Sequence, residues 1–428
     1  ITFNVPNDTA IVLSTIPGGP SEKAGLMPGD RIIRVGEREI AGKKTPQDSM
    51  TRLMKGPSGT KVKITVSREG TTIPFDIIRD KIPVHCVDAA FMVNDTTGYI
   101  KLSKFSRNTF QEFTEAADKL RAQGMKRLLF DLRDNTGGYL DQALLLSNEF
   151  LSKGDLVVYM EGLHRDRQDF KADGRGYLRD IQVSVLIDEV SASSSEIFAG
   201  AIQDNDRGVI VGRRSFGKGL VQEPINFTDG SGIRLTVARF HTPSGRCIQK
   251  PYGEAYDYDI FERYASGEMV SADSMKVDTT AVYYTVKGRV VYGGGGIRPD
   301  VYIYDDTTRV SDYMVKLVAQ GVYNEFLMEY MDCNRQQLSE KYPTFAEFDE
   351  SFDFTDEDMQ RLVTMATNKG VVYDEAGYEH SQMIMRSQLA ALVAQRLYGN
   401  SESYQLLNPR VNNSYVKALE IMKNWTQE

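Results

Sequence analysis

No part of the chain approaches the roughly 18 consecutive apolar residues that a membrane-spanning helix needs. Basic residues are also in deficit, because the formal net charge of the 428 residues is -8 and no basic run interleaved with aromatic residues is present. These two absences exclude a purely membrane-embedded protein and argue against a nucleic-acid partner. With 41% hydrophobic and 26% charged residues, the composition is that of a globular protein.

Cysteine and histidine are scarce as well. The cysteines Cys86, Cys247 and Cys333 are far apart and odd in number, so they predict neither a disulfide scaffold nor a zinc site. None of the histidines belongs to a recognisable serine-protease signature, so a conventional catalytic triad has no support and each histidine is expected to be structural. They are His85, His164, His241 and His380. The chain begins at Ile1 without a leader, so we expect a processed fragment that lacks its targeting segment.

Length and pattern predict three regions. Residues 1–80 are β-rich, residues 81–310 alternate strands with helices, and residues 311–428 have a helical period. In the middle region we expect buried strands at 128–132 and 183–187, each followed by a helix, and hence an α/β layer fold with reactive groups at strand ends. In the last region we expect helices at 310–331, 355–367 and 381–397 that serve packing, dimer contacts or shielding of the site.

The first region carries a recognisable run from Ser21 to Ile32, which resembles a PDZ domain. Such a domain binds an extended peptide by strand addition and holds its terminal carboxylate in a backbone loop. The resemblance implies that Thr2, Phe3 and Asn4 lie on the groove strand, where side chains would line the peptide pocket. It also implies that the first strand and the carboxylate loop would lie before Ile1. A small β domain used only as a spacer is the alternative.

The middle region contains a serine-rich turn from Asp188 to Glu196 and, further on, a glycine-rich segment from Gly212 to Gly219. Ser193 with Glu196 fits a helix capping box. Gly212, Gly217 and Lys218 fit part of a phosphate loop, but Gly219 lacks the required hydroxyl and the following residues predict an extended segment instead of a helix.

A third interpretation is a serine nucleophile, Ser193, with a lysine base, Lys218. A serine hydroxyl needs a base to take its proton, and a lysine serves only when its amine is neutral. Burial among apolar groups lowers the pKa of a lysine, and Phe216 and Leu220 would supply an apolar wall. The glycines on both sides of Lys218 would allow the backbone to approach closely.

Several motifs together resemble the carboxyl-terminal processing (tail-specific) proteases, serine peptidase family S41. The similarity covers about residues 10–305. Carried over by position, it implies Ser193 as the nucleophile, Lys218 as the general base and Gln222 as the residue that orients the lysine. Backbone amides of Gly138 and Ser194 would form the oxyanion hole, and Asp204 would be structural. The matching segments are 131–138, 191–196, 216–222, 242–246 and 296–300.

Ser194 departs from the family pattern, which usually has alanine there, so an exchange of roles between Ser193 and Ser194 stays open. The resemblance implies a crotonase/ClpP-like α/β protease core between an N-terminal PDZ domain and a C-terminal helical domain. It further implies polypeptide substrates bound through their C-termini, no cofactor or metal, and export to a bacterial periplasm or cell envelope, and it leaves a homo-oligomer open. A non-catalytic peptide-binding scaffold and an apolar-ligand carrier are the rival functions.

Overall fold

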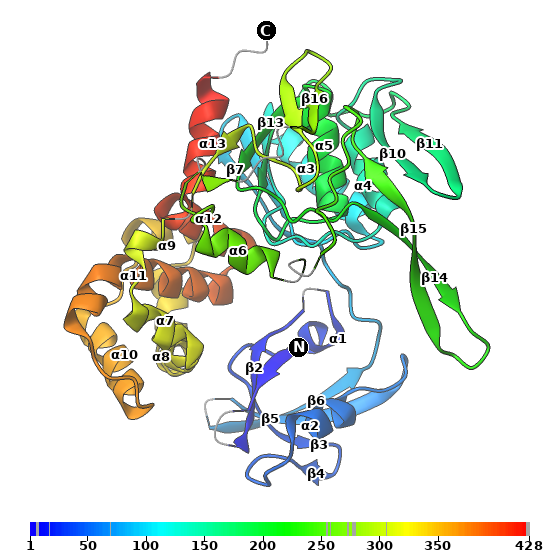
Figure 1. Cartoon of the computed structure of the whole chain (residues 1–428). Coiled ribbons are helices and arrows are strands. Elements are labelled where there is room, and N and C mark those ends of the chain that lie inside the picture. The colour runs from blue at the N-terminus through cyan, green and yellow to red at the C-terminus, as the bar shows by residue number, and fades with distance from the viewer. Residues whose placement is uncertain are drawn as a thin grey trace. The chain divides into compact units, whose positions relative to one another are not determined.

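The computed structural model describes the chain except residues 6, 7, 17, 69, 254, 255, 257, 272, 273, 276–279, 305 and 425–428 and the side chain of residue 307. Contacts divide the chain into two units, each built from segments that are distant in the sequence. The first unit combines Ile1–Val84 with Arg309–Leu406, and the second combines His85–Thr308 with Leu407–Glu428 (Figure 1).

Alternating apolar residues build the sheet at the start of the first unit. Its antiparallel strands run in the order β1-β2-β3-β5-β6, with β4 paired to β3. Val62, Ile64 and Val66 of β5 are buried, as the period of a half-buried strand requires. The β-rich character predicted for residues 1–80 is confirmed. The elements are β1 (Thr2–Asn4), β2 (Ala10–Ser14), α1 (Pro20–Lys23), β3 (Arg31–Val35), β4 (Arg38–Glu39), α2 (Gln47–Met54), β5 (Lys61–Arg68) and β6 (Thr71–Ile78).

Helices make up the rest of the first unit. The predicted helix at 355–367 is confirmed as α10, whose cap Thr355 accepts a hydrogen bond from the N–H of Asp358. The predicted helix at 310–331 is instead two helices, because Gly321 takes a left-handed conformation with φ 68° between them. The elements are α7 (Asp312–Ala319), α8 (Val322–Lys341), α9 (Phe345–Ser351), α10 (Asp356–Asn368) and α11 (Glu375–Leu397), followed by α12 (Asn400–Val411).

The second unit is organised around a six-stranded sheet of order β18-β13-β12-β9-β8-β7. All neighbours pair in parallel except β7 and β8. The buried apolar runs predicted at 128–132 and 183–187 are its central strands, as expected for strands covered on both faces. The strands are β7 (Val87–Asn94), β8 (Thr97–Leu102), β9 (Arg127–Asp131), β12 (Gln182–Ile187), β13 (Gly208–Gly212) and β18 (Val301–Tyr302).

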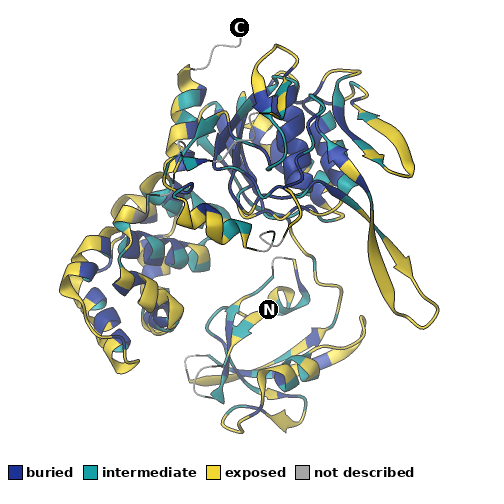
Figure 2. Ribbon diagram, in the orientation of Figure 1, coloured by how far each residue is buried: buried dark blue, intermediate teal, exposed yellow. Residues whose placement is uncertain are grey.

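Two sets of helices cover this sheet. Phe130 packs edge-on against Phe113 and Phe198, which come from α3 (Thr109–Ala122) and α5 (Ser194–Asp204). Tyr99 points to the opposite face, where its ring meets Tyr415 of α13 (Asn413–Asn424). The buried interior that results is dark blue in Figure 2. The C-terminal segment of the chain therefore completes the core of the second unit.

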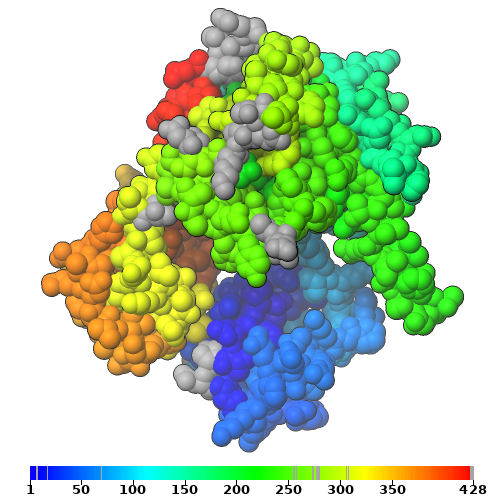
Figure 3. Space-filling model, in the orientation of Figure 1, coloured from blue at the N-terminus to red at the C-terminus, as the bar shows by residue number. Residues whose placement is uncertain are grey.

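A second sheet, of order β11-β10-β15-β14, accompanies the first. Its strands β14 and β15 extend into a hairpin whose outer part is exposed and projects from the surface (Figure 3). The remaining elements are α4 (Leu140–Asn148), β10 (Leu156–Gly162), β11 (Arg165–Lys171), β14 (Leu220–Asn226), β15 (Gly232–His241), α6 (Asp259–Ala265), β16 (Val282–Tyr284) and β17 (Val290–Tyr292). An N-terminal β-rich region, an α/β core and a C-terminal helical region follow one another along the chain, as the predicted fold class requires.

Candidate active site

Ser193 lies on the turn that connects β12 to α5. Its φ of 56° and ψ of -114° are outside the regions that side-chain-bearing residues normally adopt, so the turn is strained. Ser193 is half-buried and forms a capping box with Glu196, in which each side chain faces the backbone N–H of the other residue. The capping box predicted from the spacing is therefore present, and it coexists with an unusual backbone conformation at Ser193.

Glu196, on the first turn of α5, connects this turn to the segment that carries Lys218. Its carboxylate is completely buried and accepts hydrogen bonds from the N–H of Ser193 at 2.9 Å and the N–H of Lys218 at 2.8 Å. It also accepts from the N–H of Gly217 at 2.7 Å and the hydroxyl of Ser215 at 2.6 Å. Burial raises the pKa of Glu196, although these donors oppose the rise. One side chain therefore fixes the serine turn against the lysine loop.

Lys218 is half-buried in the loop before β14. Within the described part of the chain its ammonium has no hydrogen-bond or ion-pair partner. Gly219 permits close packing, because a Cβ there would lie 2.8 Å from the backbone nitrogen of Gln249. The strand that follows confirms the predicted extended segment and removes the phosphate-loop interpretation, which requires a helix at this point.

The Gly137–Gly138 turn lies directly against Ser193. A Cβ at Gly137 would be 2.8 Å from the Cβ of Ser193 and 2.5 Å from the carbonyl oxygen of Ala192, and its φ is 92°. At Gly138, with φ 152°, a Cβ would lie 1.9 Å from the carbonyl oxygen of Phe105. Only glycine fits either position, so the turn depends on both residues.

Two backbone amides next to Ser193 are free to bind a ligand. Among the described residues, neither the N–H of Ser194 nor that of Gly138 has a hydrogen-bond acceptor. The hydroxyl of Ser194 donates to the carbonyl oxygen of Gly138 at 3.1 Å. That bond occupies the hydroxyl of Ser194.

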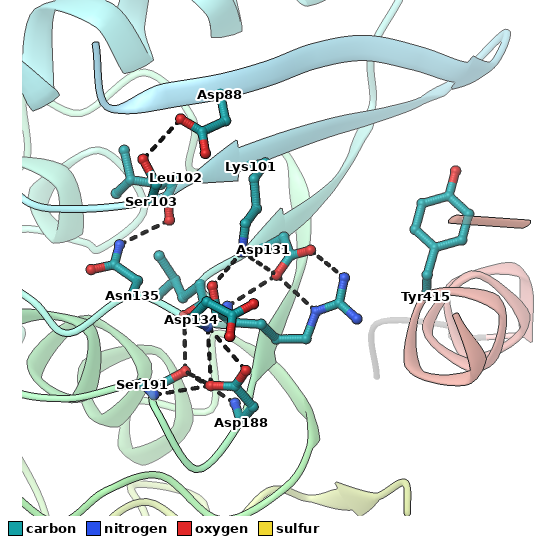
Figure 4. Close-up of polar contacts among 12 residues, drawn as sticks. Asp88, Lys101, Leu102, Ser103, Asp131, Asp134, Asn135, Asp188, Ser191 and Tyr415 are labelled. Atoms are coloured by element: carbon teal, nitrogen blue, oxygen red, sulfur yellow. Dashed lines mark hydrogen bonds and ion pairs between the residues drawn. The ribbon is translucent and has the colours of Figure 1, made fainter. Parts of the chain in front are cut away.

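Buried polar residues support the segment that leads into the glycine turn (Figure 4). Asp131, at the end of β9, receives the guanidinium of Arg133, the hydroxyl of Tyr99 at 2.7 Å and the ammonium of Lys101 at 3.4 Å. Burial would raise the pKa of Asp131, but the charges of Arg133 and Lys101 outweigh it and hold the pKa below its ordinary value. Arg133 also donates to Asn412, which precedes α13.

Asp188 and Asn135 complete this support. Asp188 accepts from the N–H of Asp134 at 3.0 Å and from the hydroxyl of Ser191, and its burial raises its pKa. Asn135 donates to the carbonyl of Leu102 and accepts from the N–H of residue 137, both at 2.9 Å. The glycine turn and the serine turn thus lie on one continuous polar framework.

Gln222, expected to orient the lysine, lies on β14 with an exposed side chain. No hydrogen bond joins it to Lys218 among the described residues. The β-bulge between Val221 and Gln222 sets the direction in which this side chain points. Gln222 therefore lies on the strand that follows the lysine loop, and its side chain makes no described contact with that of Lys218.

An apolar groove of about 480 Å³ lies between β1 and α2 in the first unit. Phe3 lines it from the strand, and Thr51 and Met54 line it from the helix. Thr2 and Asn4 alternate to the exposed side of the strand and are absent from its described lining. Of the three residues predicted for the peptide pocket, only Phe3 therefore borders this groove.

Some supporting residues were not singled out by the sequence. Glu196 was visible only as half of a capping box, because spacing along the chain cannot show its bonds to the lysine loop. Gln249 accepts from the N–H of Gly219 at 2.9 Å, and Arg263 donates to the carbonyl of Ser215 at 3.2 Å. Neither residue belongs to a motif with a recognisable chemical spacing. Across the described residues, no group of three or more potential metal-ligating side chains gathers at one place.

Ser193, the two unbonded amides beside it and the loop of Lys218 thus lie around one serine turn. In the comparison with known proteins, residues 96–260 match the model of peptidase family S41, and residues 1–78 match the model of a PDZ domain. Residues 313–399 match a family of unknown function (DUF8443). The family predicted from the motifs is thereby confirmed.

Two relatives illustrate the similarity. The carboxy-terminal processing protease CtpA of Bacillus subtilis is 36% identical over 241 residues, which are 56% of this chain and 51% of the relative. A CtpA-like serine protease of Staphylococcus epidermidis is 35% identical over 244 residues, 56% of this chain and 49% of the relative. The chain thus spans about half the length of these relatives. The solved photosystem II D1 C-terminal processing protease aligns over 72% of each chain with 25% identity and a TM-score of 0.39.

Proposed function

We propose that the chain is a serine endopeptidase that cleaves protein substrates near their C-termini, with Ser193 as nucleophile and Lys218 as general base. The observation that carries the proposal is the carboxylate of Glu196, which accepts hydrogen bonds from the backbone of both residues. Because their backbones share one buried anchor, the two side chains start from a fixed mutual position. The match of residues 96–260 to the S41 family model supports the same assignment.

The reaction begins when the neutral amine of Lys218 takes the proton from the hydroxyl of Ser193. The serine oxygen then bonds to the carbonyl carbon of the peptide, and the carbonyl oxygen becomes an oxyanion. The amides of Ser194 and Gly138, which lack acceptors in the described structure, would donate to this oxyanion. Each preorganised donor of this kind contributes about 3 kcal/mol to the transition state.

Collapse of the tetrahedral intermediate breaks the carbon–nitrogen bond. The departing amine takes the proton from the ammonium of Lys218, and the acyl group stays on Ser193 as an ester. Water then attacks the ester, Lys218 accepts the water proton, and the second product leaves as a carboxylate. Lys218 finally returns the proton to the serine oxygen. Every proton transfer uses the same lysine, so the proposed chemistry calls for no metal or cofactor.

The groove in the first unit would capture the substrate. Its lining by Phe3, Met54 and Ile77 suits an apolar side chain at the end of an extended peptide that adds to strand β1. We further propose Gln222 as an orienting residue that reaches the lysine when substrate is bound. Asp204, which pairs with the buried Arg246 at 2.8 Å, fits the structural role expected of it.

An exported location, in a bacterial periplasm or cell envelope, is part of the proposal and derives from the family resemblance. No described helix has the length and apolar character needed to cross a membrane. Assembly into a homo-oligomer stays a proposal to be measured in solution.

Covalent labelling with a fluorophosphonate probe tests the proposed function. We expect labelling of the wild type, loss of labelling in Ser193→Ala, and strong reduction in Lys218→Ala. Ser194→Ala is the matched control, since its hydroxyl bonds to Gly138 and should not react. Labelling that survives Ser193→Ala would refute the assignment. Absence of labelling in the wild type, even with a bound peptide, would favour a peptide-binding scaffold or an apolar-ligand carrier.

A further inference from the structure

A second lysine, Lys250, is buried beside the loop that carries Lys218. Its ammonium lies 4.1 Å from the centroid of the Phe216 ring and 4.4 Å from the centroid of the Tyr256 ring. The carboxylate of Asp259, at the start of α6, lies 3.3 Å from the same ammonium. A cation held against two aromatic faces and a carboxylate has a well-defined position.

The backbone next to this cation holds both neighbours of Lys218. The N–H of Lys250 donates to the carbonyl oxygen of Gly217 at 3.0 Å, and the N–H of Gly219 donates to the side-chain oxygen of Gln249 at 2.9 Å. A Cβ at Gly217 would lie 3.2 Å from the Cβ of Lys250, so the two segments are closely packed. The peptide units on both sides of Lys218 are therefore fixed by residues 249 and 250.

Helix α6 forms hydrogen bonds with the beginning of the same loop. Its Arg263 donates to the carbonyl oxygens of Ser215 at 3.2 Å and Arg214 at 2.6 Å. Because Asp259 lies on the first turn of that helix, its ion pair with Lys250 joins the two contacts into one clamp. The clamp lies outside the loop, whereas Glu196 holds the loop from α5.

Packing alone does not explain a lysine at position 250. An unbranched apolar side chain such as methionine would fill the same slot between the rings of Phe216 and Tyr256 without the cost of burying a charge. The ammonium of Lys250 interacts with the carboxylate of Asp259 and with the electron-rich faces of the aromatic rings. A methionine at this position would lose both electrostatic interactions. The charge of Lys250 therefore helps to fix the position of the loop that carries Lys218.

We propose that Lys250 is a positioning residue, which fixes the segment from Phe216 to Gly219 so that the amine of Lys218 meets the hydroxyl of Ser193. This inference rests on the proposed function. The two lysines thus have different roles. The charge of Lys250 fixes the position of the loop, whereas the amine of Lys218 transfers protons. Lys250 touches no reacting atom and acts through the loop.

The test compares Lys250→Met, Lys250→Arg and Asp259→Asn in the full chain. The substrate is a protein with an apolar C-terminus, and kcat and KM are measured separately. We expect kcat of Lys250→Met to fall by about 10- to 100-fold with KM nearly unchanged, since a displaced catalytic group slows chemistry more than binding. Lys250→Arg retains the charge and stacks on aromatic rings, so it should recover most of kcat. Asp259→Asn, at a partly exposed site that does not threaten folding, should lower kcat in the same way.

Lys341→Met is the matched control, because Lys341 also lies over an aromatic ring, that of Tyr342 at 4.9 Å, in the first unit. Its kinetics should equal those of the wild type. Unchanged kcat in both Lys250→Met and Asp259→Asn, a rise in KM instead of a fall in kcat, or failure of Lys250→Arg to recover activity would each overturn the inference. Ser193→Ala and Lys218→Ala are measured alongside. If those two variants still cleave, the proposed function itself fails, whatever the result at Lys250.

Discussion

Glu196 and Lys218 are joined by a hydrogen bond of 2.8 Å from the backbone N–H of the lysine to the carboxylate of the glutamate. The same oxygen accepts the N–H of Ser193. Both contacts use the backbone N–H groups of the serine and the lysine. The anchor is completely buried, and water cannot replace it when it is removed.

Glu196→Gln should therefore impair catalysis more than folding. The substitution keeps the shape but turns an NH2 group toward donors that the carboxylate accepts. We expect kcat to fall by about 100-fold with little change in KM, measured by steady-state cleavage. The matched control is Glu149→Gln, since Glu149 is also buried and accepts a backbone N–H, that of Tyr177 at 3.1 Å. Equal effects of the two variants on kcat would mean that Glu196 is merely structural.

Gly137→Ala should abolish activity through a direct clash. The added Cβ would lie 2.8 Å from the Cβ of Ser193, in a backbone conformation with φ 92°. We expect the rate of fluorophosphonate labelling to fall by at least about 100-fold. Gly154→Ala is a close control, because Gly154 has φ 94° and open space around it. That variant bears the same backbone strain without the clash, and near-normal labelling of Gly137→Ala would contradict the proposed oxyanion turn.

Asp131→Asn should destabilise the second unit in a pH-dependent way. Because the pKa of Asp131 lies below its ordinary value, its stabilising effect is complete above roughly pH 4 and is lost as the pH falls through the folded-state pKa. We expect the variant to be less stable by about 3 kcal/mol at pH 7. The difference from the wild type should shrink only as the pH falls below about 4, measured by chemical unfolding. A difference independent of pH would exclude the charge pairing with Arg133 as its source.

Phe3→Ala should weaken capture of peptides with an apolar C-terminal residue. Phe3 lines the groove between β1 and α2, and loss of its ring removes apolar contact area there. We expect Kd to rise by about tenfold in a fluorescence anisotropy titration. Thr2→Ala provides the control on the neighbouring, outward-facing position. A larger effect at Thr2 than at Phe3 would place the peptide on the other side of the strand.

The fold was predictable where its signal is local and periodic. The buried runs of β9 and β12 and the helix at 355–367 were predicted from the sequence nearly as they occur in the structure. The break at Gly321 was missed because the helical period continues across it, and only the left-handed conformation reveals the stop. Helix α11 begins at Glu375 instead of Ser381, because its polar first turns carry no apolar period.

The site was predictable as residue types but not as contacts. Motif order identified the serine, the lysine and the glycine turn, which the structure gathers around Glu196. The exposed position of Gln222 and the outward direction of Thr2 and Asn4 depend on a β-bulge and on strand register. The role argued for Lys250 depends on rings that come from Phe216 and Tyr256, far apart in the chain. No spacing rule brings such partners together.

Residues 413–424 belong to the second unit although they follow the helices of the first unit in the sequence, and this order affects folding during biosynthesis. During translation the strands of the central sheet leave the ribosome long before α13, which covers the face that carries Tyr99. That face, which also carries the ion pair of Lys101 and Asp131, stays open while residues 309–406 are still being made. A chain interrupted in that interval would hold every residue of the predicted dyad yet lack a closed core. Late closure would delay proteolytic competence until synthesis of the helical region is finished, and would make truncated chains targets for chaperones.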